Sequence, residues 1–179
     1  MNVTSNGSSL RKISGCDGCA DAGAVSQQQI ISGDGYLEFT ASETSSVRLI
    51  GWRSGRPGAN RNEIQFAIRL RSGGVAQVRE LGLTRTTTTY VRGDVFRIAV
   101  VAGTVRYYKN GRLLYISGLA PAYPLTVGTA LISRGATVTN VIISGRFSKG
   151  TAMPLDSAGS AVSWSDNRFD GFEGVQRAV

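Results

Sequence analysis

The stretch that decides the fold is TVRYYKNGRLLYI, residues 104–116. Asn110-Gly111 near its centre is the strongest short-range signal for a β-hairpin, because a type I′ turn needs positive φ at both central positions. A two-residue loop there pairs Lys109 with Arg112, Tyr108 with Leu113, Tyr107 with Leu114, and Arg106 with Tyr115. The stretch therefore predicts two antiparallel strands that carry large side chains on both faces.

A second turn, at Ala102-Gly103, joins the preceding strand to this hairpin. It pairs Val100 with Val105, Ile98 with Tyr107, and Arg97 with Tyr108. Because side chains alternate between the faces of a strand, the two registers can be checked against each other, and they agree. The predicted core face carries Phe96, Ile98, Val100, Val105, Tyr107, Leu114 and Ile116. The opposite face carries Arg97, Ala99, Arg106, Tyr108, Leu113 and Tyr115.

A further hairpin is predicted in EIQFAIRLRSGGVAQVRELG, residues 63–82. Its inward side chains are Ile64, Phe66, Ile68, Leu70 and Val78. A three-residue loop at 72–74 turns Arg69, Arg71, Gln77 and Arg79 outward. If both hairpins lie in the same sheet, their outer face is a basic aromatic platform.

The remainder of the chain has no helical period, and short alternating runs recur between Gly-rich turns every ~8–12 residues, which is typical of a β-sandwich or barrel. The expected strands are 2–5, 9–13, 27–31, 35–41, 46–52, 63–71, 75–80, 86–91, 94–101, 104–109, 112–117, 125–132 and 137–145. The alternation stops at Phe147. We therefore expect one β-sandwich domain at 1–145 and a tail or linker at 146–179, which packs back through Trp164, Phe169 and Phe172 or stays separate.

The chain of 179 residues carries 17 Arg, 3 Lys, no His and a net charge of +8. A basic excess favours anionic partners such as nucleic acid, acidic polysaccharide or a membrane surface, although a biased source composition explains it equally well. No apolar run is long enough to span a bilayer. The N-terminus lacks the apolar region of a secretory signal, so the compartment stays open.

The two cysteines, Cys16 and Cys19, either form a short-range disulfide or remain free thiols, because they cannot make a four-ligand zinc site without histidine. The tail offers a calcium candidate in Asp166, Asp170 and Glu173, whose spacing does not match an EF-hand loop. A solvated tail accounts for the same residues. No other cofactor is expected.

GDVFRIAVVAGTVRYYKNGRLLY (93–115) resembles the stretch of SPRY-like and concanavalin A-like domains in which a Gly-Asp-Val strand leads into a Tyr-Lys-Asn-Gly hairpin. SGDGYLEFTASE (32–43), NEIQFAIRLRSGGVAQVRE (62–80) and GATVTNVIISG (135–145) resemble matching segments in a bacterial group of such sandwiches. The resemblance covers residues 2–145 and implies an antiparallel jelly roll of two sheets, a module of extracellular proteins. Such sandwiches bind carbohydrate, bind protein or hydrolyse β-glucans.

Hydrolysis of a glycan needs two carboxylates, and laminarinase-type enzymes of this fold place them at alternating positions on one strand. The strand that resembles theirs has one acid, Glu63, followed by Gln65 and Ala67. The absence of histidine also excludes Ser-His-Asp and Cys-His chemistry within the chain. Arg92-Gly93-Asp94 spells an integrin-type tripeptide, but Gly93-Asp94 also opens a strand in the resembling family. We therefore expect a non-catalytic protein.

The expected function is an extracellular or cell-surface recognition module for polysaccharide or glycan, acidic ones being favoured by the charge. Aromatic rings stack on sugar rings, and arginine donates forked hydrogen bonds. The candidate ligand-binding residues are Trp52, Arg69, Arg71, Arg79, Arg97, Arg106, Tyr108 and Tyr115. The alternative is a structural subunit of a surface or fibrous assembly, in which the tail or another copy covers this face. Nucleic acid is not favoured, because no RNP-like, OB-type or zinc-knuckle motif accompanies the charge.

Overall fold

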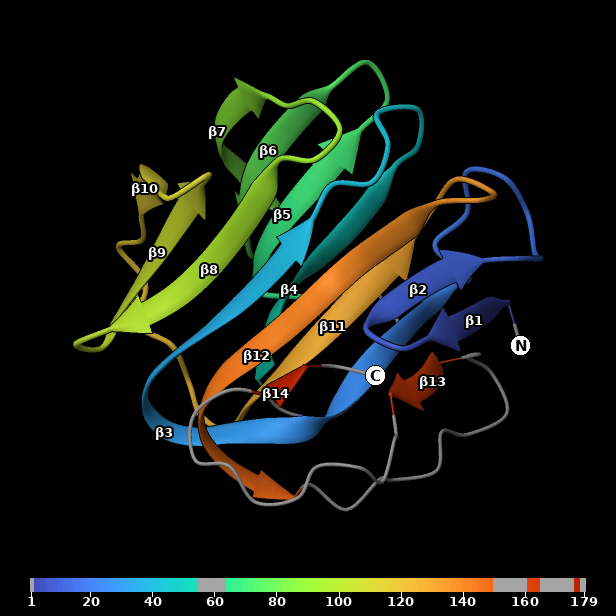
Figure 1. The fold of residues 1–179 in the computed structure, drawn as a ribbon. Helices are drawn as coiled ribbons and strands as arrows, with labels where there is room; N and C mark the ends of the chain where they lie inside the picture. The colour runs from blue at the N-terminus through green and yellow to red at the C-terminus, as the bar shows by residue number, and fades with distance from the viewer. Residues whose placement is uncertain (1, 55–63, 150–160, 165–175, 178–179) are drawn as a thin grey trace.

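The computed structural model describes residues 2–54, 64–149, 161–164 and 176–177, and these residues form strands and loops (Figure 1). The strands are β1 (Val3–Asn6), β2 (Ser9–Lys12), β3 (Gly23–Thr40), β4 (Arg48–Ser54), β5 (Phe66–Arg71), β6 (Val75–Glu80), β7 (Leu83–Thr89), β8 (Val95–Val101), β9 (Thr104–Lys109), β10 (Arg112–Ile116), β11 (Leu125–Leu131), β12 (Thr137–Lys149), β13 (Ala161–Trp164) and β14 (Gln176–Arg177). Within the described residues, no helix suited to crossing a membrane is found.

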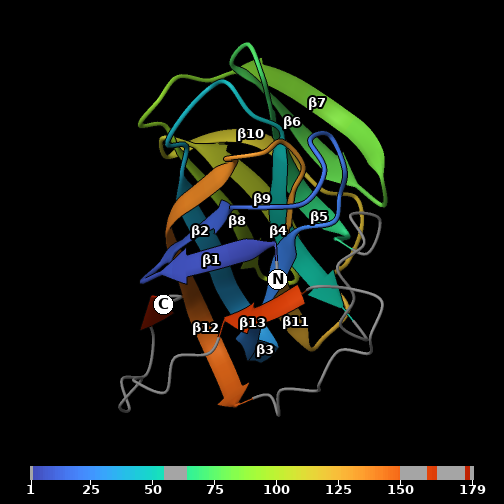
Figure 2. The same ribbon diagram turned by 90° about the vertical axis from the view of Figure 1, so that its right-hand side faces the viewer.

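The strands build two facing layers that share β3 and β12 (Figures 1 and 2). One layer runs β7-β6-β5-β4-β11 and ends on the first half of β3. The other runs β10-β9-β8, continues through the second half of β3 and β12, and ends on β2 and β1. Among the described residues, the strand pairings are antiparallel except that of β13 with β3. The predicted fold class, an all-β antiparallel sandwich of two sheets, is confirmed.

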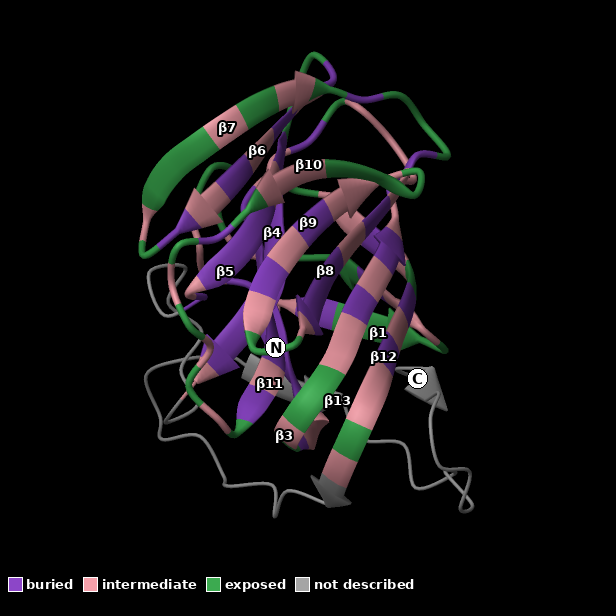
Figure 3. Ribbon diagram, turned by 90° about the vertical axis from the view of Figure 1, so that its left-hand side faces the viewer, coloured by how far each residue is buried: buried purple, intermediate pink, exposed green. Residues whose placement is uncertain are grey.

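The hydrophobic core lies between the two layers. Its position explains why apolar and polar residues alternate along the strands. Buried residues alternate with half-buried ones in the first half of β8 and of β9, as the burial colours show (Figure 3). Burial of their apolar area is the main stabilising contribution. The predicted inward residues Phe96, Ile98, Val100, Val105 and Tyr107 are at most 1% exposed, which confirms that part of the core face.

The second predicted hairpin is also confirmed, with one difference. Arg71 pairs with Val75, so the loop is 72–74, and Phe66, Ile68, Leu70 and Val78 enter the main core. Ile64 is buried as expected but belongs to a separate apolar cluster with Leu49 and Ala67. The reason is that β5 begins only at Phe66, so the alternation does not extend back to Ile64.

The Asn110-Gly111 turn has the predicted geometry, since φ is 49° at Asn110 and 77° at Gly111. The registers Val100–Val105, Ile98–Tyr107 and Arg97–Tyr108 are as predicted. Across the turn, Lys109–Arg112 and Tyr108–Leu113 are as predicted, but Tyr107 then pairs with Tyr115 and Arg106 with Ile116.

A β-bulge at Leu114 causes this change, because one inserted residue exchanges the faces of all residues after it. Ile116 is therefore 49% exposed and not part of the core face, so its predicted position is wrong. The predicted position of Tyr115 is also wrong. Tyr115 was expected on the outer face, but it packs on the core, and its ring centroid lies 5.9 Å from that of Tyr107.

Several strand predictions differ in extent. Residues 23–40 form the single long strand β3, where two short strands were expected at 27–31 and 35–41. β7 begins at Leu83 and not at 86. Beyond residue 145, β12 continues to Lys149, β13 pairs with β3, and β14 pairs with β12. Phe169 and Phe172 lie outside the described residues, and the domain boundary at 145 stays a prediction.

The loop between β2 and β3 folds around the buried ammonium group of Lys12. Cys16 and Cys19 form a disulfide in this loop, and Lys12 Nζ donates to both of their carbonyl oxygens at 2.7 and 2.9 Å. The same nitrogen contacts Ile132 O at 3.0 Å and Asp21 Oδ1 at 2.5 Å. Hydrogen bonds from Lys12 and from the Cys16 N–H hold the pKa of Asp21 below its ordinary value.

Candidate functional site

The predicted basic aromatic platform is divided between the two outer faces of the sandwich. β5 and β6 belong to one layer, and β8 and β9 belong to the other. Arg69, Arg71 and Arg79 therefore lie on the opposite side of the molecule from the face of Arg97, Arg106 and Tyr108. The expectation that all of them share one surface is wrong, because hairpin registers contain no information about which layer each hairpin joins.

Trp52 is not available for stacking on a ligand. It is fully buried in the core, and its indole Nε1 donates to Ile98 O of the facing layer at 3.1 Å. The predicted ligand-binding role of Trp52 is therefore wrong. The alternation of β4 is the reason, since Arg48, Ile50 and Trp52 share the inward face of that strand.

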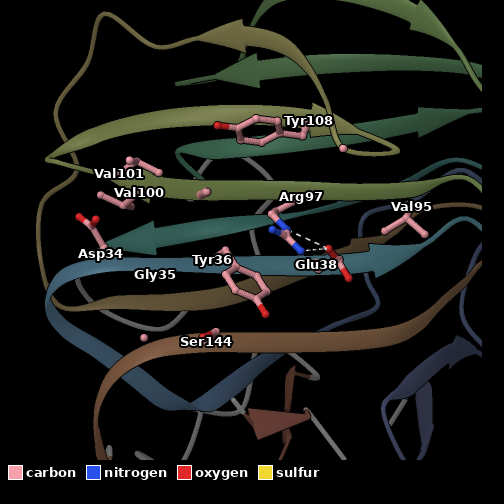
Figure 4. A pocket seen from close by; sticks show the side chains of 13 residues that line it. Asp34, Gly35, Tyr36, Glu38, Val95, Arg97, Val100, Val101, Tyr108 and Ser144 are labelled. Carbon is pink, nitrogen blue, oxygen red and sulfur yellow. Dashed lines mark hydrogen bonds and ion pairs between the residues drawn. The ribbon is translucent and has the colours of Figure 1, made fainter. Parts of the chain in front are cut away.

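A hollow that we call the β3–β8 groove lies on the outer face of β12, β3, β8 and β9 (Figure 4). Its volume is about 530 Å³, within the ~300–1,000 Å³ typical of small-molecule sites. The lining side chains that carry chemistry are Asp34, Tyr36, Glu38, Arg97, Tyr108 and Ser144. Of the predicted ligand-binding residues, Arg97 and Tyr108 thus line one site.

Strand register explains which side chains meet in the groove. One row across β12, β3, β8, β9 and β10 consists of Ile142, Glu38, Arg97, Tyr108 and Leu113. The next row consists of Ser144, Tyr36, Ala99, Arg106 and Ile116. Directly opposed residues on one face lie about 4.5–5.5 Å apart at Cβ, so each row is a set of touching neighbours. Arg106 lies opposite Ala99 in the second row, but it is not among the residues that line the groove.

The guanidinium group of Arg97 is held by two residues of β3. Its Nε donates to Glu38 Oε2 at 2.8 Å, and its Nη2 lies 2.6 Å from the same oxygen. Its central carbon lies 4.2 Å from the centroid of the Tyr36 ring, a cation–π contact. Figure 4 shows Arg97 between Tyr36 and Tyr108, with both ion-pair contacts drawn. The arginine is thereby positioned before any ligand arrives.

The acidic residues of the groove are also engaged. Asp34 Oδ1 accepts the backbone N–H of Ala102 at 2.8 Å, and Glu38 is paired with Arg97. The formal charges lining the groove are two carboxylates and one guanidinium. The groove itself therefore lacks the strong positive charge of the whole chain.

Residues from β3 and β12 were missed by the sequence reasoning. Tyr36 and Glu38 alternate with the buried Leu37 and Phe39, so the pattern YLEF marks their outward face. That signal could have placed them on a surface, but their meeting with Arg97 depends on the pairing of β3 with β8, which no turn indicates.

Asp94 of the Arg-Gly-Asp tripeptide is 8% exposed, and its carboxylate accepts from Asn110 in the hairpin turn. Burial pushes its pKa up, but hydrogen bonds from the Asn110 amide, the Val91 N–H and the Lys109 ammonium outweigh burial, so its pKa lies below the ordinary value. Such a carboxylate is not presented for recognition by a receptor.

No cluster of three or more potential metal ligands among His, Cys, Asp and Glu is found in the described part of the chain. The calcium candidate Asp166, Asp170 and Glu173 lies outside those residues, as does Glu63.

Comparison with known proteins is informative about fold. No protein-family model matches the chain, and no curated protein matches it. Among solved structures, the SPRY domain of human HERC1 is similar with a TM-score of 0.56 and 17% identity, over 79% of this chain and 92% of that one.

Two carbohydrate-active proteins are more distant. An alginate lyase, AlgAT5 from polysaccharide lyase family 7, has a TM-score of 0.46 and 16% identity over 78% of this chain and 68% of its own. A Bacillus licheniformis β-glucanase has a TM-score of 0.43 and 8% identity over 80% and 76%. At these identities the similarity concerns the backbone only. The chain has the concanavalin A-like, SPRY-like β-sandwich fold.

Proposed function

We propose that the protein is a non-catalytic recognition module that binds a glycan in the β3–β8 groove. The observation that carries the proposal is the preorganised Arg97, held by Glu38 and stacked on Tyr36 beside the half-buried ring of Tyr108. Sugars present flat C–H faces for an aromatic ring and hydroxyl groups for a guanidinium or carboxylate. A positioned arginine loses little side-chain entropy on binding, which favours affinity.

The charge of the groove supports a neutral glycan over an acidic one. The net charge of +8 favoured acidic ligands, but Arg97 is already neutralised by Glu38, and Asp34 adds a further negative charge. An acidic sugar placed here would meet two carboxylates against one guanidinium. The basic excess then acts as a general attraction for polyanions, which salt would screen.

Binding without hydrolysis is supported by the contacts of the two acids that line the groove. Asp34 Oδ1 accepts the backbone N–H of Ala102, and Glu38 Oε2 accepts from Arg97, so each carboxylate already holds part of the groove wall in place.

The proposal is tested by a glycan array followed by calorimetric titration of the positive sugars. We expect binding that Tyr36→Ala and Tyr108→Ala each weaken about tenfold, the loss of one stacking contact of ~1–2 kcal/mol. Gln77→Ala, on the outer face of the other layer, is the matched control and should bind normally. If no glycan binds, or if both tyrosine variants bind like the wild type, the proposal fails.

The exposed edge of β10 supports a second candidate, self-assembly as a structural subunit. Leu113 and Ile116 are 50% and 49% exposed, and both continue the rows of the groove to the sheet edge. Apolar side chains on an edge strand favour pairing with another copy. Sedimentation of the purified protein distinguishes the candidates: assembly that Leu113→Lys abolishes supports this second one.

An extracellular or cell-surface location forms part of the proposal. The disulfide between Cys16 and Cys19 supports it, because such bonds persist in oxidising compartments. Detection of the protein on intact cells with an impermeant label is the test, and exclusive labelling after lysis would contradict it.

A further inference from the structure

A second hollow adjoins the β3–β8 groove and shares a wall with it. It has a volume of about 320 Å³, and its lining residues are Ser8, Glu38, Thr40, Asn140 and Ile142. Glu38 borders both hollows. The two spaces therefore meet at one carboxylate on β3, on the same outer face of the sandwich.

A β-bulge in β12 forms the floor of this second hollow. Val138 and Val141 are three residues apart, yet both are buried in the core, so one residue is inserted into the alternation. The register of β12 against β3 shifts between Thr139 and Ile142, and Asn140 has a φ of 54°. A left-handed residue in a strand is uncommon outside glycine, and bulges of this kind redirect side chains near functional sites.

The bulge directs Asn140 to the surface and ties it to its neighbours. Its Nδ2 donates to Thr40 Oγ1 at 3.3 Å, and the next residue, Val141, donates its N–H to Ser8 O at 3.0 Å. The turn between β1 and β2 is thereby fastened against the bulge. The amide of Asn140 and the hydroxyl of Thr40 lie together in a hollow that contains no cation among its lining residues.

The junction between the hollows has an available acceptor. Both contacts from Arg97 end on Oε2 of Glu38, and no donor within the described part of the chain contacts Oε1. A carboxylate oxygen held in place by an ion pair at its partner atom is a strong acceptor for a hydroxyl group. Because Glu38 lines both hollows, a ligand that occupies both passes beside this carboxylate.

We propose that these hollows are two subsites for one ligand, an internal stretch of a linear neutral oligosaccharide that crosses β8, β3 and β12. This inference rests on the proposed function. In it, Tyr36, Arg97 and Tyr108 hold one end of the bound stretch, Glu38 Oε1 accepts from a hydroxyl group at the junction, and Asn140 and Ser8 hold the other end. A single terminal sugar would fill only the first hollow.

The test is calorimetric titration of an array-positive glycan supplied as a series of increasing chain length, with wild type and Asn140→Gly. Glycine adopts the left-handed conformation without strain, so this variant removes the amide and keeps the bulge. Leu81→Gly is the matched control, because Leu81 has a φ of 50° and is exposed in the turn between β6 and β7.

We expect wild-type affinity to rise with chain length and then level off. Asn140→Gly should weaken the longer chains about three- to tenfold, as the loss of one or two hydrogen bonds does, and the shortest binding sugar less than twofold. Leu81→Gly should change neither.

Two outcomes overturn the inference while the proposed function stands. One is a wild-type affinity that does not depend on chain length although Tyr36→Ala weakens it. The other is an Asn140→Gly variant that weakens short and long chains equally or not at all. If no length of glycan binds the wild type, both the inference and the proposed function fail.

Discussion

The guanidinium carbon of Arg97 lies 4.2 Å from the centroid of the Tyr36 ring, although the two residues lie on β8 and β3, which no hairpin turn connects. They meet because Tyr36 pairs with Ala99 and Glu38 pairs with Arg97, so the arginine lies beside both outward side chains of β3. This contact restricts the movement of the Arg97 guanidinium group. The group can then donate hydrogen bonds to a ligand from a fixed position in the groove.

Arg97→Lys should weaken glycan binding about tenfold at unchanged stability. Lysine keeps the charge and the pair with Glu38, but it lacks the planar fork and stacks poorly on Tyr36. Calorimetric titration measures the loss, and thermal unfolding checks the fold. Arg71→Lys at the exposed end of β5 serves as control. Unchanged affinity in Arg97→Lys would show that only the charge matters.

Glu38→Gln should shift ligand preference toward acidic glycans. The substitution removes one of the two carboxylates in the groove and releases the charge of Arg97. Competition between a neutral and an acidic oligosaccharide of equal length measures the ratio of affinities, which we expect to change at least fivefold at low salt. A ratio equal to that of the wild type would contradict the charge balance derived for the groove.

Trp52→Phe should destabilise the fold by about 2–3 kcal/mol, because it leaves a small cavity and removes the donor to Ile98 O. Urea unfolding monitored by circular dichroism gives the change. Glycan affinity should stay as in the wild type, since Trp52 is fully buried between the layers. A loss of binding without a loss of stability would instead restore Trp52 as a ligand contact.

Asp21→Asn should lower Tm by about 3–6 °C at neutral pH, because the buried ammonium of Lys12 loses its counter-charge. In a domain of this size, such a shift corresponds to a loss of ~1–2 kcal/mol in the free energy of unfolding. The pKa of Asp21 is lowered by Lys12, so its contribution is complete above the unfolded value of ~3.9 and is lost as pH falls through the lower folded value. The difference in Tm between wild type and variant should therefore shrink below about pH 4. A constant difference from pH 7 to 3 would show that the ion pair is not its source.

Asp94→Asn should destabilise the protein by about 1–2 kcal/mol, whereas Arg92→Ala should change stability by less than ~0.5 kcal/mol. Asp94 is bound to Asn110 and to the Val91 N–H, while Arg92 is exposed. Thermal unfolding compares the two. Equal losses of stability in the two variants would mean that the Asp94 carboxylate does not hold the tripeptide in place.

Local rules in the sequence predicted the hairpins, and the structure shows how far those rules extend. The Asn110-Gly111 turn and the registers from Phe96 to Leu113 follow from turn chemistry and alternation, both of which act between neighbouring residues. They end at the bulge after Leu113, because the preference of Tyr115 for the ring of Tyr107 is a packing effect that no turn signal encodes.

The candidate site was predictable only in part for the same reason. Arg97 and Tyr108 share a hairpin, and register alone placed them side by side. Glu38 is 59 residues from Arg97 in sequence, so their pairing depends on which strand joins the open edge of β8.

The sequence by itself determined an all-β chain, its hairpin turns and the inward face of most strands, because these depend on residue type and on contacts a few positions apart. Only the tertiary structure decided that the arginines of β5 and β6 face away from those of β8 and β9, that Trp52 closes the core, and that Tyr36 and Glu38 fix Arg97. Layer assignment is a property of the whole core, since two sheets bury their apolar faces together and no single strand specifies its partner sheet.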